Sequence, residues 1–109
     1  MQDVNKKNFE EEVLQAEQPV IVDFWGPSCQ PCLKLMPDVE QLAEEYGDQV
    51  KIVKLNSSEN RKVCITHRVM GLPSFLLFKD GKEVNRISGG ELTKEDIKKL
   101  IDESLEVSQ

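Results

Sequence analysis

The chain has 109 residues, of which 39% are hydrophobic and 31% are charged. This length and composition indicate one globular domain and argue against a disordered or membrane-embedded chain. The formal net charge of -6 should repel the phosphates of nucleic acids and anionic lipids, so we expect neither a nucleic-acid nor a membrane partner.

The cysteine content and the first residues bear on the cellular compartment. Three cysteines are too few, and too odd in number, for a secreted domain held together by disulfides. Residues 1–7 lack the apolar stretch of a signal peptide, and no apolar run reaches the ~18 residues of a transmembrane helix. We therefore expect a single cytoplasmic domain over residues 1–109 that acts as a monomer.

The first half of the chain alternates predicted helices and strands. Apolar spacing predicts a short helix near residues 9–16, and the β-branched and aromatic run Val20–Trp25 predicts a strand. A longer amphipathic helix should begin near Cys32 and end at Gly47, before a second strand over Val50–Leu55. Both strands are almost wholly apolar, which indicates central strands that are covered on both faces.

The second half should contain a weaker helix followed by a hairpin. A helix over residues 58–69 would place four side chains on one face, namely Val63, Cys64, His67 and Met70. Two strands, Ser74–Phe78 and Val84–Ser88, should form the hairpin, because Asp80-Gly81 between them is a strong turn signal.

The last predicted helix has the clearest start signal. Thr93 can cap it, and Asp96 three residues later would complete a capping box. The apolar stripe of this helix would consist of Ile97, Leu100, Ile101 and Leu105. With a right-handed parallel crossover between the first two strands, these elements predict an α/β fold with a central mixed β-sheet flanked by helices on both faces.

The segment Cys29-Gln30-Pro31-Cys32 carries the strongest chemical signal. It follows an apolar strand and begins an amphipathic helix, so its spacing brings the two sulfurs within bonding distance. Cys29 should lie at the exposed end and Cys32 inside the first turn. Backbone N–H groups and the helix dipole favour a thiolate there, which predicts reversible dithiol–disulfide chemistry.

The spacing of the cysteines leaves two other interpretations open. Cys64 and His67 would complete a Cys₃His set with Cys29 and Cys32, as in structural zinc sites. Alternatively, the pair belongs to the core and has no chemistry. Outside a zinc site, Cys64 is expected to be a small half-buried hydrophobic residue and His67 a surface or helix-packing residue.

Asp23 is the one acidic residue inside the first apolar strand. An unpaired carboxylate in a strand that is covered on both faces costs several kcal/mol. One interpretation is that Asp23 faces a polar seam or the edge of the sheet. The other is a carboxyl of raised pKa beneath the cysteines, which exchanges a proton with Cys32 through water.

Several segments around these residues resemble one known family. They are Val22–Trp25 before the cysteine pair, Pro37 in the following helix, Lys54–Asn56, Gly71–Ser74, Phe78–Gly81 and Gly89. In this order and at this spacing they resemble the thioredoxin family over nearly the whole chain. The resemblance implies the thioredoxin fold, with Cys29 as the attacking thiolate and Cys32 as the buried resolving thiol, which together form the redox disulfide. It also implies that Asp23 is a proton acceptor with Lys54 as its partner.

The resemblance further implies a docking surface for an extended substrate. Pro73 is expected to be cis and to face the sulfurs, while the backbone of Leu72 pairs with the substrate by strand addition. The rim of this surface would be formed by Trp25, Gly26, Pro31, Gly71, Gly89 and Gly90. From the residues alone, an ordinary turn over residues 71–73 and a core position for Trp25 remain open.

The implied activity is the reduction of protein disulfides, with no metal and no bound cofactor. A flavin-dependent reductase of the thioredoxin-reductase type would return electrons. The chain departs from the family at Ser28, where a Trp is usual, and at Gln30, where a Gly is usual. Residues 35–40 and 56–58 are similar to thioredoxins that serve amino-acid reductases in fermenting anaerobes, which implies a dedicated reductase and substrate. An oxidase or isomerase of the same fold and a non-catalytic scaffold are the alternatives.

Overall fold

The computed structural model describes residues 1–106 and contains a five-stranded sheet in the order β1-β3-β2-β4-β5. The strands are β1 (Gln2–Val4), β2 (Val20–Trp25), β3 (Lys51–Asn56), β4 (Ser74–Lys79) and β5 (Lys82–Ser88). β3 pairs in parallel with β1 and β2, whereas β4 pairs antiparallel with β2 and β5. The predicted α/β class, the mixed sheet and the parallel crossover are confirmed.

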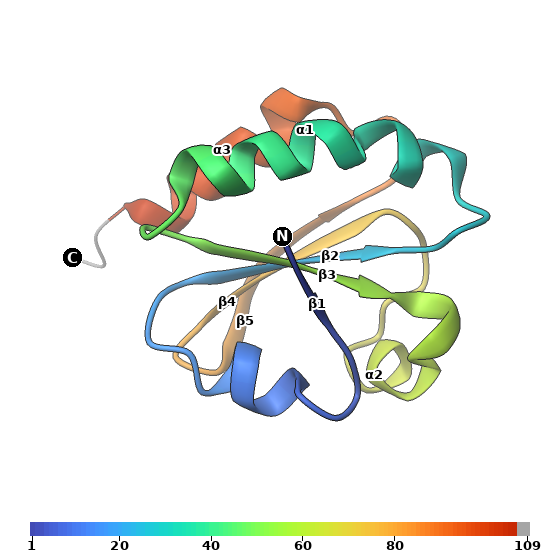
Figure 1. The fold of residues 1–109 in the computed structure, drawn as a ribbon, viewed down its shortest axis with the longest axis horizontal. Coiled ribbons are helices and arrows are strands. Elements are labelled where there is room, and N and C mark those ends of the chain that lie inside the picture. The colour runs from blue at the N-terminus through green and yellow to red at the C-terminus, as the bar shows by residue number, and fades with distance from the viewer. Residues whose placement is uncertain (107–109) are drawn as a thin grey trace.

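Helices cover both faces of this sheet (Figure 1). One face carries α1 (Gln30–Tyr46) and α3 (Lys94–Leu105), which lie side by side. The other face carries the short π-helical segment η1 (Glu10–Leu14) and the helix α2 (Arg61–Thr66). A 3-10 turn, η2 (Ser57–Glu59), leads from β3 into α2.

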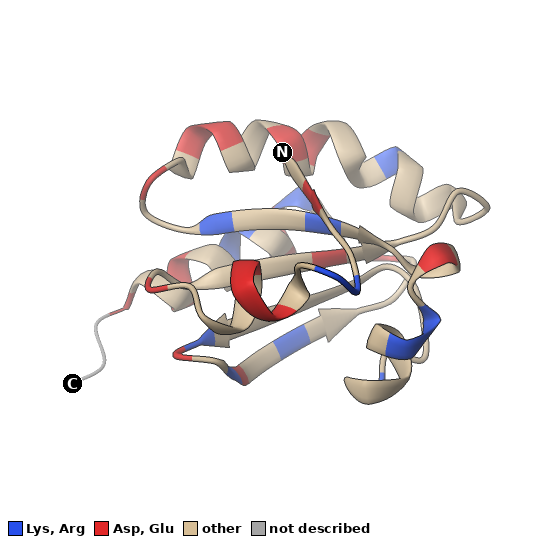
Figure 2. Cartoon of the chain, turned by 60° about the horizontal axis from the view of Figure 1, so that its bottom comes forward, with Lys and Arg blue, Asp and Glu red and all other residues tan. Residues whose placement is uncertain are grey.

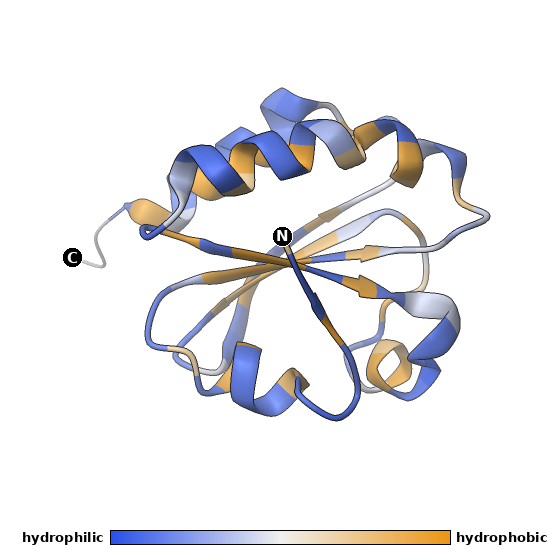
Figure 3. Cartoon of the chain, in the orientation of Figure 1, coloured by the Kyte–Doolittle hydropathy of each residue, from blue (hydrophilic) through white to orange (hydrophobic). Residues whose placement is uncertain are grey.

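The central strand β2 divides the core into two layers because its side chains alternate between the faces. Val20, Val22 and Phe24 pack with residues of η1 and α2, whereas Ile21 packs with residues of α1 and α3. The apolar residues run along the strands and along the inner sides of the helices (Figure 3). As predicted, β2 and β3 are central strands, and most of their side chains are buried.

The ends of two elements follow the sequence signals closely. Thr93 caps α3: its Oγ1 accepts a hydrogen bond from the Asp96 N–H at 3.3 Å, and Asp96 Oδ2 accepts one from the Thr93 N–H at 2.9 Å. The hairpin turns at Asp80 and Gly81, which have φ values of 52° and 78°. A Cβ atom on Gly81 would lie 2.9 Å from the carbonyl oxygen of Leu14, so this turn requires glycine.

The structure differs from the sequence expectations in two places. β1 was not predicted, because Gln2–Val4 is short and contributes only one buried side chain, Val4. α2 is shorter than the predicted helix over residues 58–69, and the expected shared face is wrong for Met70, which is 95% exposed. The helix ends at Thr66, and Arg68 then adopts a positive φ of 55°, which turns Met70 out of the helical face.

Candidate active site

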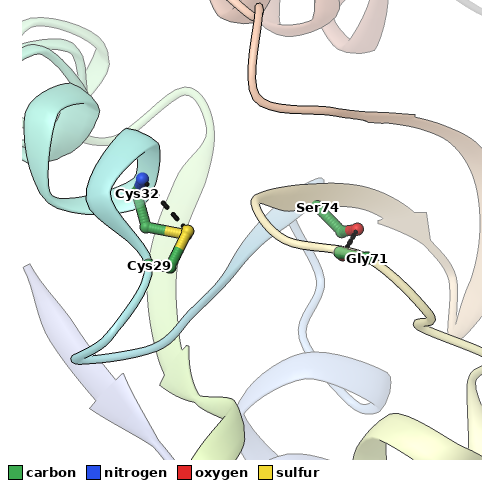
Figure 4. Close-up of a disulfide and its surroundings, with 4 residues drawn as sticks. All are labelled: Cys29, Cys32, Gly71 and Ser74. Carbon is green, nitrogen blue, oxygen red and sulfur yellow. Dashed lines mark hydrogen bonds between the residues drawn. A yellow bond between two sulfur atoms is a disulfide. The ribbon is translucent and has the colours of Figure 1, made fainter.

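Cys29 and Cys32 lie at the N-terminus of α1 and are joined by a disulfide with an S–S distance of 2.10 Å (Figure 4). Cys29 is the N-cap residue, and its Sγ accepts a hydrogen bond from the Cys32 N–H at 3.2 Å. Cys32 is 2% exposed, whereas Cys29 is only partly buried. Cys29 is therefore the more accessible of the two cysteines.

Local interactions hold the cysteine loop at the end of β2. The strand ends at Trp25, and the Cys29 N–H donates to the Gly26 carbonyl at 3.0 Å, which closes a tight turn. Pro31 lies in the first turn of α1, where a missing N–H removes no helical hydrogen bond. The unpaired N–H groups of this turn form the positive end of the helix dipole, which stabilises negative charge on the Cys29 sulfur.

The loop Gly71–Ser74 lies opposite the disulfide (Figure 4). The Leu72–Pro73 peptide bond in this loop is cis. The Ser74 hydroxyl donates to the Gly71 carbonyl at 2.5 Å and so fixes the turn that leads into β4. A Cβ atom on Gly26 would meet Leu72 Cδ1 at 3.3 Å, so the two loops pack directly against each other.

The loop after β5 completes this end of the molecule. The Gly89 N–H donates to the Pro73 carbonyl at 3.0 Å, which ties the loop to the cis proline. Gly89 has a φ of 126°, a conformation that favours glycine. A Cβ atom on Gly90 would lie 3.3 Å from the Pro31 ring. The structure therefore brings the loops that carry the predicted rim residues together around the cysteine pair.

Asp23 lies on β2 and is 2% exposed. Its side chain points to the same sheet face as Ile21, which is the face covered by α1. Burial raises the pKa of the Asp23 carboxyl to about 7, although the nearby charge of Lys54 acts in the opposite direction. Among residues 1–106, Asp23 Oδ1 has no hydrogen-bond partner. The carboxyl is therefore able to change its protonation state near neutral pH.

Lys54 is paired in register with Asp23 across the parallel strands β2 and β3. Its Nζ lies 3.9 Å from Asp3 Oδ1 and 5.8 Å from the centre of the Trp25 ring. Lys54 thus influences Asp23 through its charge, while its ion pair is with Asp3. The Trp25 ring itself is partly exposed, but its Nε1 is buried and has no hydrogen-bond partner within residues 1–106.

His67 and Cys64 take positions that differ from those of a zinc site. The His67 ring packs 5.0 Å from the Phe9 ring and 5.5 Å from the Phe78 ring, and burial lowers the pKa of His67. Cys64 is a free thiol that is 9% exposed in the layer that η1 and α2 form with the sheet. In the described part of the chain, no group of three or more His, Cys, Asp or Glu side chains is placed to hold a metal ion.

Sequence reasoning missed the side chains that hold the end of α2 and the loop Gly71–Ser74 that follows it. Besides the Ser74 hydroxyl, Arg86 on β5 donates to the carbonyl oxygens of His67 and Arg68 at 2.7 and 3.1 Å. These residues are separated by 19 and 18 positions along the chain, so no local pattern could have identified the contacts.

The family model described as Thioredoxin matches residues 1–103. The chain is 43% identical over 96 residues to a thioredoxin of Acetoanaerobium sticklandii, an overlap that covers 88% of this chain and 87% of that protein. It is 39% identical over 99 residues to a thioredoxin of Peptoclostridium acidaminophilum, covering 91% and 90%. It is 42% identical over 86 residues to thioredoxin 1 of Synechococcus elongatus, covering 79% and 80%.

Proposed function

The chain belongs to the thioredoxin family and is a thiol–disulfide oxidoreductase that acts through Cys29 and Cys32, and we propose distinct roles for these two sulfurs. Cys29 is the nucleophile and Cys32 is the resolving thiol. The observation that carries this assignment is the unequal environment of the pair. The partly exposed Cys29 sulfur accepts a hydrogen bond from a backbone N–H, whereas Cys32 is 2% exposed.

The reaction consists of two successive thiol–disulfide exchanges. The Cys29 thiolate attacks one sulfur of a protein disulfide, whose S–S bond breaks; the departing thiolate takes a proton from water, and a mixed disulfide remains. Cys32 then loses its proton and attacks the Cys29 sulfur, which forms the Cys29–Cys32 bond and releases the second substrate sulfur. Two electrons pass from the dithiol to the substrate.

Asp23 is the proton acceptor for Cys32 in this proposal, acting through water, and Lys54 adjusts the charge balance around it. A pKa of about 7 supports this role, because an acid–base group works best when its pKa lies near the ambient pH. The position of Asp23 on the sheet face beneath α1 is also consistent with it.

The substrate would dock along the loop that faces the cysteines. In this proposal the backbone of Leu72 pairs with an extended substrate segment. The surrounding rim consists of Trp25, Gly26, Pro31, Gly71, Pro73, Gly89 and Gly90. The close packing of Leu72 on Gly26 and of Pro31 on Gly90 supports this arrangement, since it brings the loops that carry these residues together.

We assign the return of electrons to a flavin-dependent reductase of the thioredoxin-reductase type, and Ser28 and Gln30 beside the nucleophile favour a dedicated partner. A monomer in the cytoplasm fits such a role, since that compartment is reducing. None of the helices within residues 1–106 has the length and apolar character needed to cross a bilayer.

The roles of the sulfurs are tested with the variant Cys32→Ser in cell extract. It should accumulate substrates as mixed disulfides on Cys29, because the second step cannot occur. The variant Cys64→Ser is the matched control and should release its substrates like the unmodified protein. Equal trapping by both variants, or trapping through Cys64, would contradict the assignment.

A further inference from the structure

A groove of about 480 Å³ lies beside the loop that faces the disulfide. We call it the α2 groove; it is lined by Ser57, Arg61, Cys64, Ile65, Val69, Met70 and Leu72. Most of these side chains are apolar. Leu72 also packs against Gly26 in the cysteine loop, so the α2 groove is continuous with the surface where a substrate disulfide must dock.

Two large apolar side chains of the α2 groove are strongly exposed to solvent. Met70 is 95% exposed and Ile65 is 74% exposed, which makes them the most exposed large apolar side chains within residues 1–106. The other exposed large apolar side chains in this part of the chain, Met1, Leu33 and Val84, are 38%, 40% and 52% exposed. Large apolar side chains that gather next to a reactive site are typical of an interaction surface.

The backbone that presents Met70 is held in place from β5. Arg86 donates to the carbonyl oxygens of His67 and Arg68 and is itself ion-paired with Glu83. These contacts fix the turn in which Arg68 has a φ of 55°. The exposure of Met70 is therefore part of a supported conformation, and a bound partner would meet a surface that is already formed.

The charge around the α2 groove is opposite to that of the whole chain. Residues 59–72 carry the bases Arg61, Lys62 and Arg68 and the single acid Glu59, while the chain has a net charge of -6. Figure 2 shows blue residues on α2 and red residues on α1 and η1. An acidic partner would be repelled by most of the surface and attracted at this end, which would orient it.

We propose that the α2 groove selects disulfide-bearing segments that carry a large apolar side chain and a carboxylate beside the reactive cysteine. The apolar side chain packs on Met70 and Ile65, and the carboxylate pairs with Arg61. The inference rests on the proposed function, since it describes how a substrate engages the surface next to Cys29. It makes Met70 and Arg61 specificity-determining residues for the exchange reaction.

The test uses synthetic peptides with one disulfide each and otherwise identical sequences. One peptide has Leu and Glu next to the cysteine, and the other has Ser and Lys there. The unmodified protein should reduce the Leu/Glu peptide with a kcat/KM about tenfold higher. The variant Met70→Ser should lose most of this preference, and Arg61→Glu should shift it towards the Ser/Lys peptide. Val84→Ser is the matched control, because Val84 is 52% exposed and lies on β5.

The neutral reagent 2-hydroxyethyl disulfide separates this inference from the exchange reaction itself. All four proteins should reduce it at equal rates, since it is too small to fill the α2 groove. No peptide preference in the unmodified protein, or equal effects of Met70→Ser and Val84→Ser, would overturn the groove assignment. If sedimentation shows that the unmodified protein is a dimer and that Met70→Ser is a monomer, the groove binds a second copy of the chain, and the assignment to substrate segments is overturned. Failure of the unmodified protein to reduce any disulfide would instead contradict the proposed roles of the cysteines.

Discussion

In both α1 and α3, the side chain of the N-cap residue accepts a hydrogen bond from the N–H three residues later, yet the two N-cap residues have different roles. At α3, the Thr93 hydroxyl accepts from the Asp96 N–H, and Asp96 returns the interaction. At α1, the Cys29 sulfur accepts from the Cys32 N–H, and that same sulfur forms the disulfide. One cap stabilises its helix, whereas the other uses the helix to stabilise a reactive atom.

Buried polar groups on α3 and near the end of the sheet that holds the cysteines differ in whether they have hydrogen-bond partners. Buried polar side chains elsewhere, such as Ser104 on α3, have hydrogen-bond partners. The buried polar atoms that have none within residues 1–106 are Asp23 Oδ1, Trp25 Nε1 and Ser57 Oγ, on β2 and directly after β3. Unsatisfied polar groups are costly, and here they are concentrated near the end of the sheet that holds the cysteines.

Replacing the cap of α1 should give the largest effect. Cys29→Ser keeps an oxygen that can accept the Cys32 N–H, so the free energy of unfolding of the reduced protein should change by less than about 1 kcal/mol. Disulfide reduction should fall by at least about a thousandfold, because a serine hydroxyl is not ionised near neutral pH. Turnover of a protein disulfide and urea unfolding under reducing conditions measure the two effects, and substantial residual turnover would contradict the role of Cys29.

The next effect concerns the carboxyl beneath α1. Below about pH 3, both folded and unfolded chains hold the Asp23 proton. As the pH rises to about 7, the unfolded carboxyl ionises while the folded one stays protonated, so the free energy of unfolding should fall by about 4 kcal/mol in total. Asp23→Asn should abolish this decline and slow the resolution of mixed disulfides by about tenfold or more.

Urea unfolding at about pH 4 and about pH 8 measures the change for Asp23, and rapid mixing measures the resolution rate. The conservative variant Asp23→Glu, which still titrates, should keep a pH-dependent decline. A wild-type free energy of unfolding that does not fall between these pH values would show that Asp23 ionises normally. If Asp23→Asn cleaves mixed disulfides at the wild-type rate, Asp23 is not the proton acceptor.

The smallest effect is expected at the cap of α3. Thr93→Ala removes the acceptor for the Asp96 N–H and should lower the free energy of unfolding by about 1 kcal/mol, with no change in turnover. Thr93→Ser keeps the hydroxyl and should stay within a few tenths of a kcal/mol, at roughly the wild-type value. A loss of turnover in Thr93→Ala without a loss of stability would contradict the claim that the α3 cap only stabilises its helix.

Much of the fold could be predicted because its signals are local. The β-branched and aromatic run Val20–Trp25, the Asp80-Gly81 turn and the Thr93 cap each require only a few neighbouring residues. β1 lacked such a signal, since it is held mainly by its pairing with β3 far along the chain. The end of α2 was missed because Arg68 takes a positive φ that glycine or asparagine would have suggested.

The chemistry of the site was more predictable than its supports. Cys29, Cys32 and the burial of Asp23 follow from residue type and position next to a buried strand. The cis bond before Pro73 could be expected only from the resemblance, because few X–Pro bonds are cis. The hydrogen bonds of Arg86 to the end of α2 depend on tertiary packing and had no counterpart in the sequence pattern.

The two edge strands of the sheet, β1 and β5, also affect how easily a substrate dissociates after its disulfide is reduced. β1 is only three residues long, and β5 is mostly exposed, carries Lys82, Glu83 and Arg86, and follows a β4 strand with an irregular register between Leu77 and Phe78. Short, charged or irregular edges are poor templates for additional strands. A partly unfolded substrate protein therefore pairs poorly with β1 or β5 as an additional strand. It can dissociate once its sulfurs are released, without aggregating on the protein that reduced it.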